Sequence, residues 1–536
     1  MRFTPRRVTI VVLSLLFIGA IVSSISVGFT YGMPRRERKA AAVPIDEYSL
    51  EQRRDAVKEA FTFAWDGYEK YCMGHDTLHP VDNTCADDFG GWGVSAIDAL
   101  STAIIMELKP VVISILHWIV DDLDFNVVVG GTQVQFFEVV IRHFGGMISA
   151  YDLLTGPFPT LIKDDKLLKG LYGKMVELGD ILSLAFTSPA GIPHDWVSPS
   201  GVTDDGLSVV LSTLGSNILE FARLSDITGN RTYVALARRS ESYGISPKPY
   251  DAEPFPGLLG NQVNLLNGDF GNSQGSWGAL SDSFYEYLLK AYLYNADMYS
   301  SYLDRWLVAV DSTIRFLNSH PYGRPDWQLL PYWQDDMLIN YMETLSWFAG
   351  GNFILGGMVT KNETITDFGL NIADTAGKLY ASTITGLGPE YVAWTETCDS
   401  DWVEQPCDAE SSIHITDARY QLRPEVLETW YYAYRATNDS MYQDFAWKAF
   451  IAINETCRAS SGFSSIQDVT EVGGGEMTNV QESFVYAEVL KYLYLIHLTD
   501  PDADFQVQDS SVEGGRKNTW VFNTEAHPFK VKGPPV

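Results

Sequence analysis

The chain has 536 residues, of which 46% are hydrophobic, and its formal net charge is −30. This composition excludes a disordered chain and a membrane protein with many spans. It also excludes nucleic acid as a partner, because nucleic-acid affinity depends on cationic contacts that so acidic a chain does not supply.

The first predicted element is an uncharged, mostly apolar segment, residues 8–29. As a helix it would reach about 33 Å, enough to cross a hydrocarbon core of about 30 Å. We therefore expect residues 1–7 to be a cytosolic tail, 8–29 a transmembrane signal anchor and 30–49 a stem. The alternative is a cleaved signal peptide, although its apolar core usually has only about 7–15 residues.

The body after the stem is expected to be lumenal. Four Asn-x-Ser/Thr sequons favour that side of the membrane, at Asn230, Asn362, Asn438 and Asn454. The basic residues that flank the span on both sides point, if anything, the other way.

The cysteines fit an oxidising compartment without forming a disulfide scaffold. Cys72 and Cys85 flank one polar loop, and Cys398 and Cys407 flank another, so both spacings suit local disulfides. Cys457 is left over, and we expect a buried thiol there.

Helix-period segments dominate the body, and strand signals are short and sparse. No Pro/Ser-rich linker divides residues 50–536, so we expect one all-α domain. A closed ring of helical hairpins, an α/α barrel with a central acidic cavity, would bury this many helices. The clearest segments are 50–71, 94–106, 135–154, 167–185, 282–294, 338–353, 424–435, 441–457 and 481–498.

Carboxylates embedded among apolar and aromatic residues are the main chemical signal. Asp282 and Glu286 are spaced to share one helix face, and Glu425 precedes Glu428 by three residues after a proline. A solvated face or an intrahelical salt bridge is the simpler explanation for any single pair. Several buried acids on one cavity would instead suit general acid–base catalysis or a hard cation.

These segments resemble the class I α-1,2-mannosidases, glycoside hydrolase family 47, from about residue 53 to 531. The resemblance is carried by the joint order of short motifs, each weak alone. They are 137–138 with 141–142 and 145–151, then 282–290, 386–390, 422–425, 482–484, 487–495 and 521–528.

The resemblance implies an (α/α)7 barrel and a Ca²⁺-dependent, inverting hydrolase. Such an enzyme removes terminal α-1,2-linked mannose from high-mannose N-glycans, from Man9GlcNAc2 toward Man5GlcNAc2. It also implies a single-pass type II membrane protein of the Golgi or endoplasmic reticulum, anchored by one N-terminal helix. We expect it to be a monomer.

Residue roles follow from the same motifs. Glu138 resembles the proton donor and Glu425 the base that activates water, with Asp282 and Glu390 as further catalytic acids. Thr524 resembles the Ca²⁺ ligand, and Glu525 lies just outside the ion's ligands. The expected substrate-binding residues are Arg142, Leu280, Glu286, Arg423, Glu428, Phe484 and Glu488.

Departures from the family pattern leave alternatives open. Thr344 replaces a usual His and Thr213 a frequent Glu, which puts rate and branch preference in question. Leu280 is typical of members that remove several mannoses. A mannosidase-like lectin that binds without turnover is the main alternative, and an α/α-barrel hydrolase or lyase of another polysaccharide is a third.

Overall fold

The computed structural model describes residues 48–249, 252–397, 408–409, 411–498, 505–507 and 518–536. Residues 48–536 form one compact unit. The predicted tail, anchor and stem up to residue 47 lie outside the described residues, as do Cys398 and Cys407 with their predicted disulfide. Within the described part, no helix has both the length and the apolarity that a membrane span requires.

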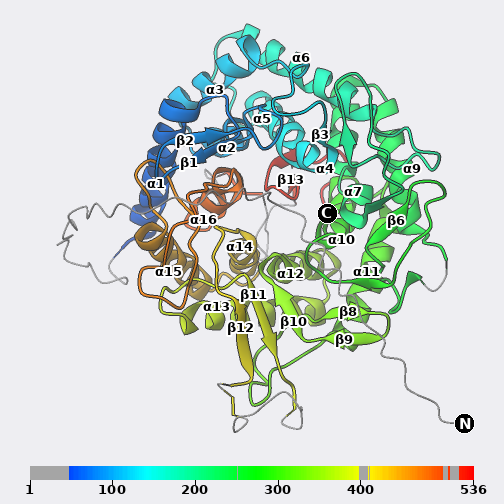
Figure 1. The fold of residues 1–536 in the computed structure, drawn as a ribbon, viewed down its shortest axis with the longest axis vertical. Helices are drawn as coiled ribbons and strands as arrows, with labels where there is room; N and C mark the ends of the chain where they lie inside the picture. Colours follow the sequence, from blue (N-terminus) through cyan, green and yellow to red (C-terminus); the bar gives the residue numbers. More distant parts are fainter. Residues whose placement is uncertain (1–47, 250–251, 398–407, 410, 499–504, 508–517) are drawn as a thin grey trace, which may run out of the picture. The chain divides into compact units, whose positions relative to one another are not determined.

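Fourteen helices of the described part form two concentric rings (Figure 1). The inner ring holds α2 (Val94–Ile105), α5 (Gly145–Thr155), α8 (Ile218–Thr228), α10 (Asp282–Tyr294), α12 (Phe348–Thr360), α14 (Glu425–Thr437) and α16 (Leu490–Leu495). The outer ring holds α1 (Leu50–Cys72), α3 (Lys109–Asp121), α6 (Asp165–Ser183), α9 (Thr232–Ile245), α11 (Ser300–Phe316), α13 (Glu363–Ser382) and α15 (Ser440–Thr456).

The chain alternates between the two rings, so its helices form seven outer–inner pairs. Each inner helix contacts the next, and the turn η5 (Val485–Val489) before α16 returns to α2 and closes the ring. The predicted all-α barrel of seven helical pairs is therefore confirmed.

The two rings differ in how their helices are buried. The inner helix α2 buries every residue from Val94 to Ile105, and its sequence is apolar or small on all sides apart from Asp98. The outer helix α6 buries one stripe that includes Leu171, Met175 and Leu178, and its charged residues face away. This contrast is expected, because a helix packed on all sides cannot keep a polar face.

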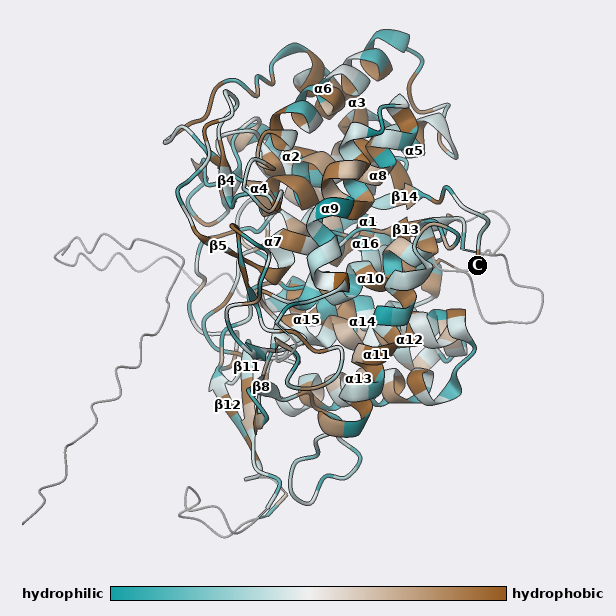
Figure 2. Cartoon of the chain, turned by 90° about the vertical axis from the view of Figure 1, so that its right-hand side faces the viewer, coloured by the Kyte–Doolittle hydropathy of each residue, from teal (hydrophilic) through white to brown (hydrophobic). Residues whose placement is uncertain are grey.

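Short antiparallel strand pairs lie at the ends of the barrel, and no described strand exceeds five residues. Figure 2 shows β4 (Trp196–Val197), β5 (Ser208–Val210), β8 (Tyr332–Gln334), β11 (Tyr391–Trp394) and β12 (Ile413–Asp417) at one end. The strands β3 (Val134–Gln135), β6 (Gln262–Asn264) and β7 (Gln274–Gly275) pair with β4, β5 and β8, respectively, and β1 (Thr77–His79) pairs with β2 (Thr84–Ala86).

A C-terminal hairpin enters the barrel from the other end. It consists of β13 (Trp520–Phe522) and β14 (Pro528–Lys530), which contact α10 and α5, and Figure 1 shows β13 inside the ring. The Phe522 ring packs between inner helices, with its centroid 6.3 Å from that of Tyr431 and 5.5 Å from that of Tyr492. The tip of this hairpin therefore reaches the barrel axis.

The helix predicted over 338–353 is wrong in its first half. The structure has β9 (Met337–Ile339) and β10 (Tyr341–Glu343), then the turn η4 (Thr344–Trp347), and only then α12. A short apolar run does not distinguish strand from helix by its periodicity, and here pairing of β10 with β11 decides for strand. The other predicted helices form, although 135–154 and 481–498 each include a π-helical turn, η2 (Val140–Phe144) and η5, and the latter helix begins only after Gln481.

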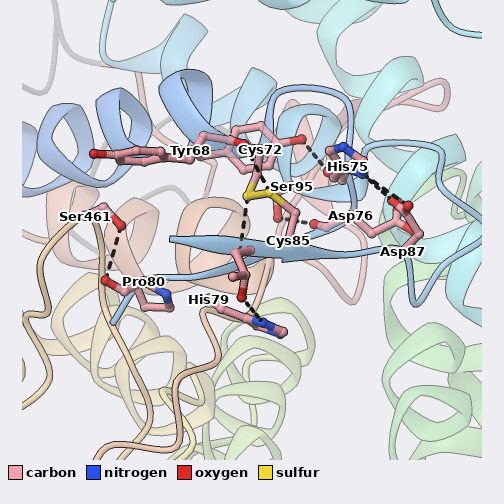
Figure 3. The surroundings of a disulfide bond; sticks show 12 residues. Tyr68, Cys72, His75, Asp76, His79, Pro80, Cys85, Asp87, Ser95 and Ser461 are labelled. Atoms are coloured by element: carbon pink, nitrogen blue, oxygen red, sulfur yellow. Dashed lines mark hydrogen bonds and ion pairs between the residues drawn. A yellow bond between two sulfur atoms is a disulfide. The ribbon is translucent and has the colours of Figure 1, made fainter. Parts of the chain in front are cut away.

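The predicted Cys72–Cys85 disulfide is present and joins the end of α1 to β2 (Figure 3). The two Cα atoms lie 5.6 Å apart, within the range that a disulfide requires. Cys457 is free and buried, as predicted.

Replacing Cys85 by serine is expected to lower the free energy of unfolding by about 3 kcal/mol, because the bond closes a short loop and restricts the unfolded chain. Urea denaturation under non-reducing conditions measures the change. Wild-type protein in reducing agent should unfold at the same urea concentration as the variant. Equal stability of oxidised wild type and variant would contradict the expectation.

Candidate active site

Several acids stand at the beginning of inner helices. Asp282 is the first residue of α10 and Glu425 the first of α14, while Glu138 lies in the short helix α4 (Phe136–Val139) that leads into α5. Because outer and inner helices alternate along the chain, the inner helices begin at the same end of the barrel. Carboxylates are favourable there, since the first helical N–H groups lack partners and the helix dipole is positive.

Left-handed backbone conformations lie close to two of these acids, Asp282 and Glu425, and to Glu525 at the C-terminal hairpin. Leu280 has φ 76° two residues before Asp282, and Leu422 has φ 59° three residues before Glu425. Ala526 has φ 52° directly after Glu525. Such conformations are costly for residues with side chains, and they persist at sites that packing and hydrogen bonds hold in place.

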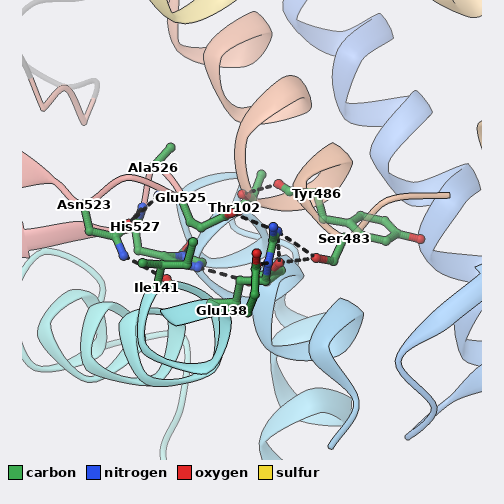
Figure 4. A network of polar contacts seen from close by, with 12 residues as sticks. Thr102, Glu138, Ile141, Ser483, Tyr486, Asn523, Glu525, Ala526 and His527 are labelled. Carbon is green, nitrogen blue, oxygen red and sulfur yellow. Dashed lines mark hydrogen bonds and ion pairs between the residues drawn. The ribbon is translucent and has the colours of Figure 1, made fainter. Parts of the chain in front are cut away.

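Arg142 joins the predicted proton donor to the C-terminal hairpin, and Figure 4 shows the polar network around its partners Glu138 and Glu525. Its Nε donates to Glu138 Oε2 at 2.8 Å, and its Nη1 lies 2.8 Å from Glu525 Oε1 and 3.8 Å from Asp98 Oδ2. Asp98, on α2, also accepts from the Ser483 hydroxyl. Three inner elements and the hairpin therefore meet at one guanidinium group.

The hairpin tip is held by buried amide and phenol groups. Asn523 Nδ2 donates to the Ile141 carbonyl oxygen at 2.8 Å and to Glu220 Oε1 at 3.0 Å. The Thr524 N–H donates to the Tyr287 hydroxyl oxygen at 3.3 Å, and that hydroxyl donates to Glu220 at 2.7 Å. Thr524 is thus fixed in position by α8 and α10.

A second group of acids lies around α14. Arg423 Nε donates to Glu390 Oε2 at 2.8 Å, while Glu425 Oε2 is buried and has no hydrogen-bond partner among the described residues. Asp282 Oδ1 accepts from the Ser212 hydroxyl at 3.1 Å. Glu425 is therefore a carboxylate with one oxygen left for another molecule.

Lys290 is a buried cation deeper on α10. It pairs with Glu286 one turn earlier and lies 3.8 Å from Glu428 on α14. Burial lowers the pKa of Lys290, but the charges of Glu286 and Glu428 outweigh it and raise that pKa. Sequence analysis did not single out this lysine, which compensates part of the charge of two predicted substrate-binding acids.

The acids influence each other's protonation. Burial first, and then the charges of Glu343 and Glu286, raise the pKa of Asp282 to about 7. Burial, Glu390 and Asp282 raise the pKa of Glu425 to about 7 as well. The acids of α10, β10 and α14 therefore lie close enough to raise one another's pKa values.

The oxygen atoms near the hairpin tip fit a hard cation. No three His, Cys, Asp or Glu residues of the described part are arranged to hold a metal ion by themselves. Neither the hydroxyl nor the carbonyl oxygen of Thr524 takes part in a hydrogen bond within that part, and Glu525 Oε2 is buried without a partner. A cation here would take hydroxyl, carbonyl and water oxygens beside acidic neighbours, which suits metals that prefer oxygen ligands.

Raised pKa values predict how stability depends on pH in the presence of EDTA. The pKa values of Asp282 and Glu425 are about 7 and that of Glu428 about 8, so the folded protein binds protons that the unfolded chain releases. This stabilisation is complete below about pH 4 and is lost as the pH rises through 7 to 8. Between pH 5.5 and 8.5 we expect Tm to fall by roughly 5 °C.

Scanning fluorimetry in EDTA measures this slope. The Glu425→Gln variant should show a smaller slope, because glutamine does not titrate. A Tm that rises over the same interval would contradict the expected sign.

The other predicted residues differ in exposure. Phe484 is buried, and its ring centroid lies 5.7 Å from Arg142 Cζ. Leu280 is 48% exposed, and Glu488 is buried, with a pKa raised by burial and by Glu525 and Glu425. Leu280 is therefore the predicted substrate-binding residue that lies on the surface, two residues before Asp282.

Sequence analysis missed two acids near the predicted catalytic ones. Glu343 Oε1 accepts the Ala279 N–H at 2.7 Å, and Asp195 Oδ1 accepts the hydroxyl of Thr213 at 2.8 Å. Neither shows helical acid spacing. Glu343 directly precedes the Thr344 departure, which could have drawn attention to it, whereas Asp195 lies 18 residues before Thr213 and has no such signal. The Thr344 hydroxyl itself donates to the carbonyl oxygen of Pro389, next to Glu390.

Known proteins resemble this chain over nearly its whole length. The family model described as glycosyl hydrolase family 47 matches residues 60–531. A mannosyl-oligosaccharide alpha-1,2-mannosidase of Penicillium citrinum is 42% identical over 94% of this chain and 96% of its own length. One from Coccidioides posadasii is 44% identical over 90% of this chain and 91% of its own.

A solved structure extends the likeness to three dimensions. The alpha-1,2-mannosidase from Trichoderma reesei has a TM-score of 0.85 and 41% sequence identity. The match covers 90% of this chain and 99% of that one.

Proposed function

This chain belongs to glycosyl hydrolase family 47, and we propose that it is a mannosyl-oligosaccharide α-1,2-mannosidase that trims high-mannose N-glycans. The observation that supports the proposal is that Arg142 joins Glu138 to Glu525, next to Thr524, while Glu425 interacts electrostatically with Asp282. Relatives with the same name match nearly the whole chain. The enzyme class therefore follows from the family, and the roles of individual residues are the proposal.

In the proposed inverting hydrolysis, the acids have different roles. Glu425 accepts a proton from the attacking water, and its pKa of about 7 suits a base that works near neutral pH. Glu138 supplies the proton that the leaving sugar oxygen needs, while Arg142 keeps its carboxylate in place. An inverting mechanism needs room for water between donor and base. Asp282 and Glu390 bind and orient sugar hydroxyls beside them.

We assign the cation of this site to Ca²⁺. The hydroxyl and carbonyl oxygens of Thr524 would hold it, with Glu525 close by, and Glu286, Glu428 and Glu488 would contribute negative charge around it. Bound there, Ca²⁺ would ligate sugar hydroxyls and favour a distorted ring. Asn523 and Tyr287 hold the hairpin tip in position for this purpose.

Residues 8–29 remain proposed as a signal anchor, which would make the protein a type II membrane protein of the Golgi or endoplasmic reticulum. Residues 50–536 would then be its lumenal catalytic domain, acting as a monomer. Leu280 supports removal of several mannoses rather than one.

Incubation with Man9GlcNAc2 tests the function. Chromatography of the glycans should show stepwise loss of mannose toward Man5GlcNAc2, and proton NMR should show β-mannose as the first product anomer. Binding without any product would instead identify a lectin. Release of α-mannose first would reject inversion but not the enzyme class.

A further inference from the structure

Two stacked tyrosines stand on the surface beside the acids. Tyr341 on β10 and Tyr391 on β11 have ring centroids 5.1 Å apart and ring planes inclined by 18°. Tyr391 is half-buried, whereas Tyr341 is 37% exposed and covers the outer face of its neighbour. An exposed aromatic ring held against a second ring is a preformed flat surface.

The strand register connects this pair to the catalytic end of the barrel. Tyr391 stands directly opposite Glu343 in the β10–β11 pair, and it follows Glu390 in the chain. Tyr391 and Glu343 influence each other electrostatically, and Glu343 accepts from the Ala279 N–H, next to Leu280. The rings are therefore continuous with the residues that lead to Asp282.

The Glu343 carboxylate lies close to the backbone of Gly278. A Cβ added at Gly278 would lie 2.1 Å from Glu343 Oε1, so a larger residue there would displace the carboxylate. Glycine at this position leaves room for the Glu343 carboxylate beside the loop of Ala279 and Leu280. The tyrosine pair, Glu343 and the Leu280 loop thus form one continuous rim.

The chemistry of this rim fits a sugar better than an apolar protein segment. A pyranose has an apolar C–H face, which packs on an aromatic ring, and hydroxyls at its edge that need hydrogen-bond partners. Carboxylates and a guanidinium surround the rings, since Glu343, Glu390 and Arg423 all act on Tyr391 electrostatically. A purely apolar occupant is disfavoured, because it would bury these charged groups without offering them hydrogen bonds, which is costly.

We propose that Tyr341, supported by Tyr391, is a subsite for a mannose of the glycan that is not being cleaved, so that it sets the affinity for branched substrates. This inference rests on the proposed function and deepens it. It explains why an aromatic ring is left exposed next to buried acids. It also predicts that the contribution of the ring depends on the size of the substrate.

Kinetics of the Tyr341→Ala variant test the subsite. We expect KM for Man9GlcNAc2 to rise about fivefold with kcat within about twofold of wild type, because the ring contacts sugar without touching the reacting atoms. With α-1,2-mannobiose, which does not reach the rim, kcat/KM should be unchanged. Tyr341→Phe keeps the ring and should behave as wild type.

Binding gives a second measurement that is independent of turnover. In the Glu425→Gln background, calorimetry should show a dissociation constant for Man9GlcNAc2 about fivefold higher once Tyr341 is also replaced by alanine. Met337→Ala is the matched control, since Met337 is 59% exposed on β9 close to Tyr341 in sequence. It should change neither constant.

The outcomes separate the subsite from the enzyme. If wild type releases mannose and Tyr341→Ala equals it in both KM and dissociation constant, the subsite is rejected and the function stands. A similar loss in Met337→Ala would also reject it, in favour of a general apolar docking surface. Absence of mannose release by wild type would reject the proposed function itself.

Discussion

Replacing Glu425 by glutamine should lower kcat for mannose release by a factor of about 10³, while the barrel stays folded. Glutamine has nearly the same shape but cannot accept a proton from water. The carboxylate is the first residue of α14, and its buried Oε2 has no partner among the described residues, so no hydrogen bond is lost there. Because Glu390 and Asp282 repel its charge, Tm should be unchanged or slightly higher.

Glu363→Gln is the matched control for this substitution. Glu363 is likewise the first residue of a helix, the outer helix α13, but its side chain is exposed. We expect wild-type rates and a wild-type Tm from it. Chromatographic quantification of Man9GlcNAc2 products measures both variants, and activity of Glu425→Gln within tenfold of wild type would reject the role as base.

Chelation by EDTA should lower the rate of mannose release by about 10²-fold or more, and added Ca²⁺ should restore it. Removing the cation takes positive charge away from the acids beside Thr524, so they would no longer orient sugar hydroxyls correctly. Tm should also fall, since a ligand that binds only the folded state stabilises it by mass action.

Substitutions at the hairpin tip test where the cation binds. Thr524→Ala should need a much higher Ca²⁺ concentration for half-maximal activity and for the rise in Tm, whereas Thr524→Ser keeps the hydroxyl and should resemble wild type. Mg²⁺ at the same concentration should restore less activity, because it releases its waters reluctantly and demands stricter geometry. Undiminished turnover after complete chelation would contradict the calcium assignment.

Much of the barrel could be predicted from sequence because helix periodicity is a local property. The segment 282–294 was predicted with the bounds that α10 has, and α1 and α14 begin at or next to their predicted starts. Embedding of Asp282, Glu286 and Glu428 among aromatic residues correctly indicated inner helices rather than a solvated face.

The remainder depends on contacts between distant segments, which local patterns do not encode. The strand β10 forms because β11, about fifty residues later, pairs with it. Glu343 shows no helical spacing to another acid, yet the loop before α10 places it beside Asp282. The pairing of Arg142 with Glu525 likewise joins residues that are far apart in the chain, so only the closed ring reveals it.

The closure of the ring also constrains how this protein is made. Helix α2 is covered by η5, and the two are separated by about 380 residues. A ribosome that adds about 5–20 residues per second needs roughly 20–80 s to synthesise that stretch. During this time the side of α2 that packs on η5 lacks its native cover, and the hairpin that fills the axis is translated later still. The nascent polypeptide therefore exposes apolar surface until that hairpin has been made, and a premature stop codon before residue 520 should yield a product that is degraded rather than a weaker enzyme.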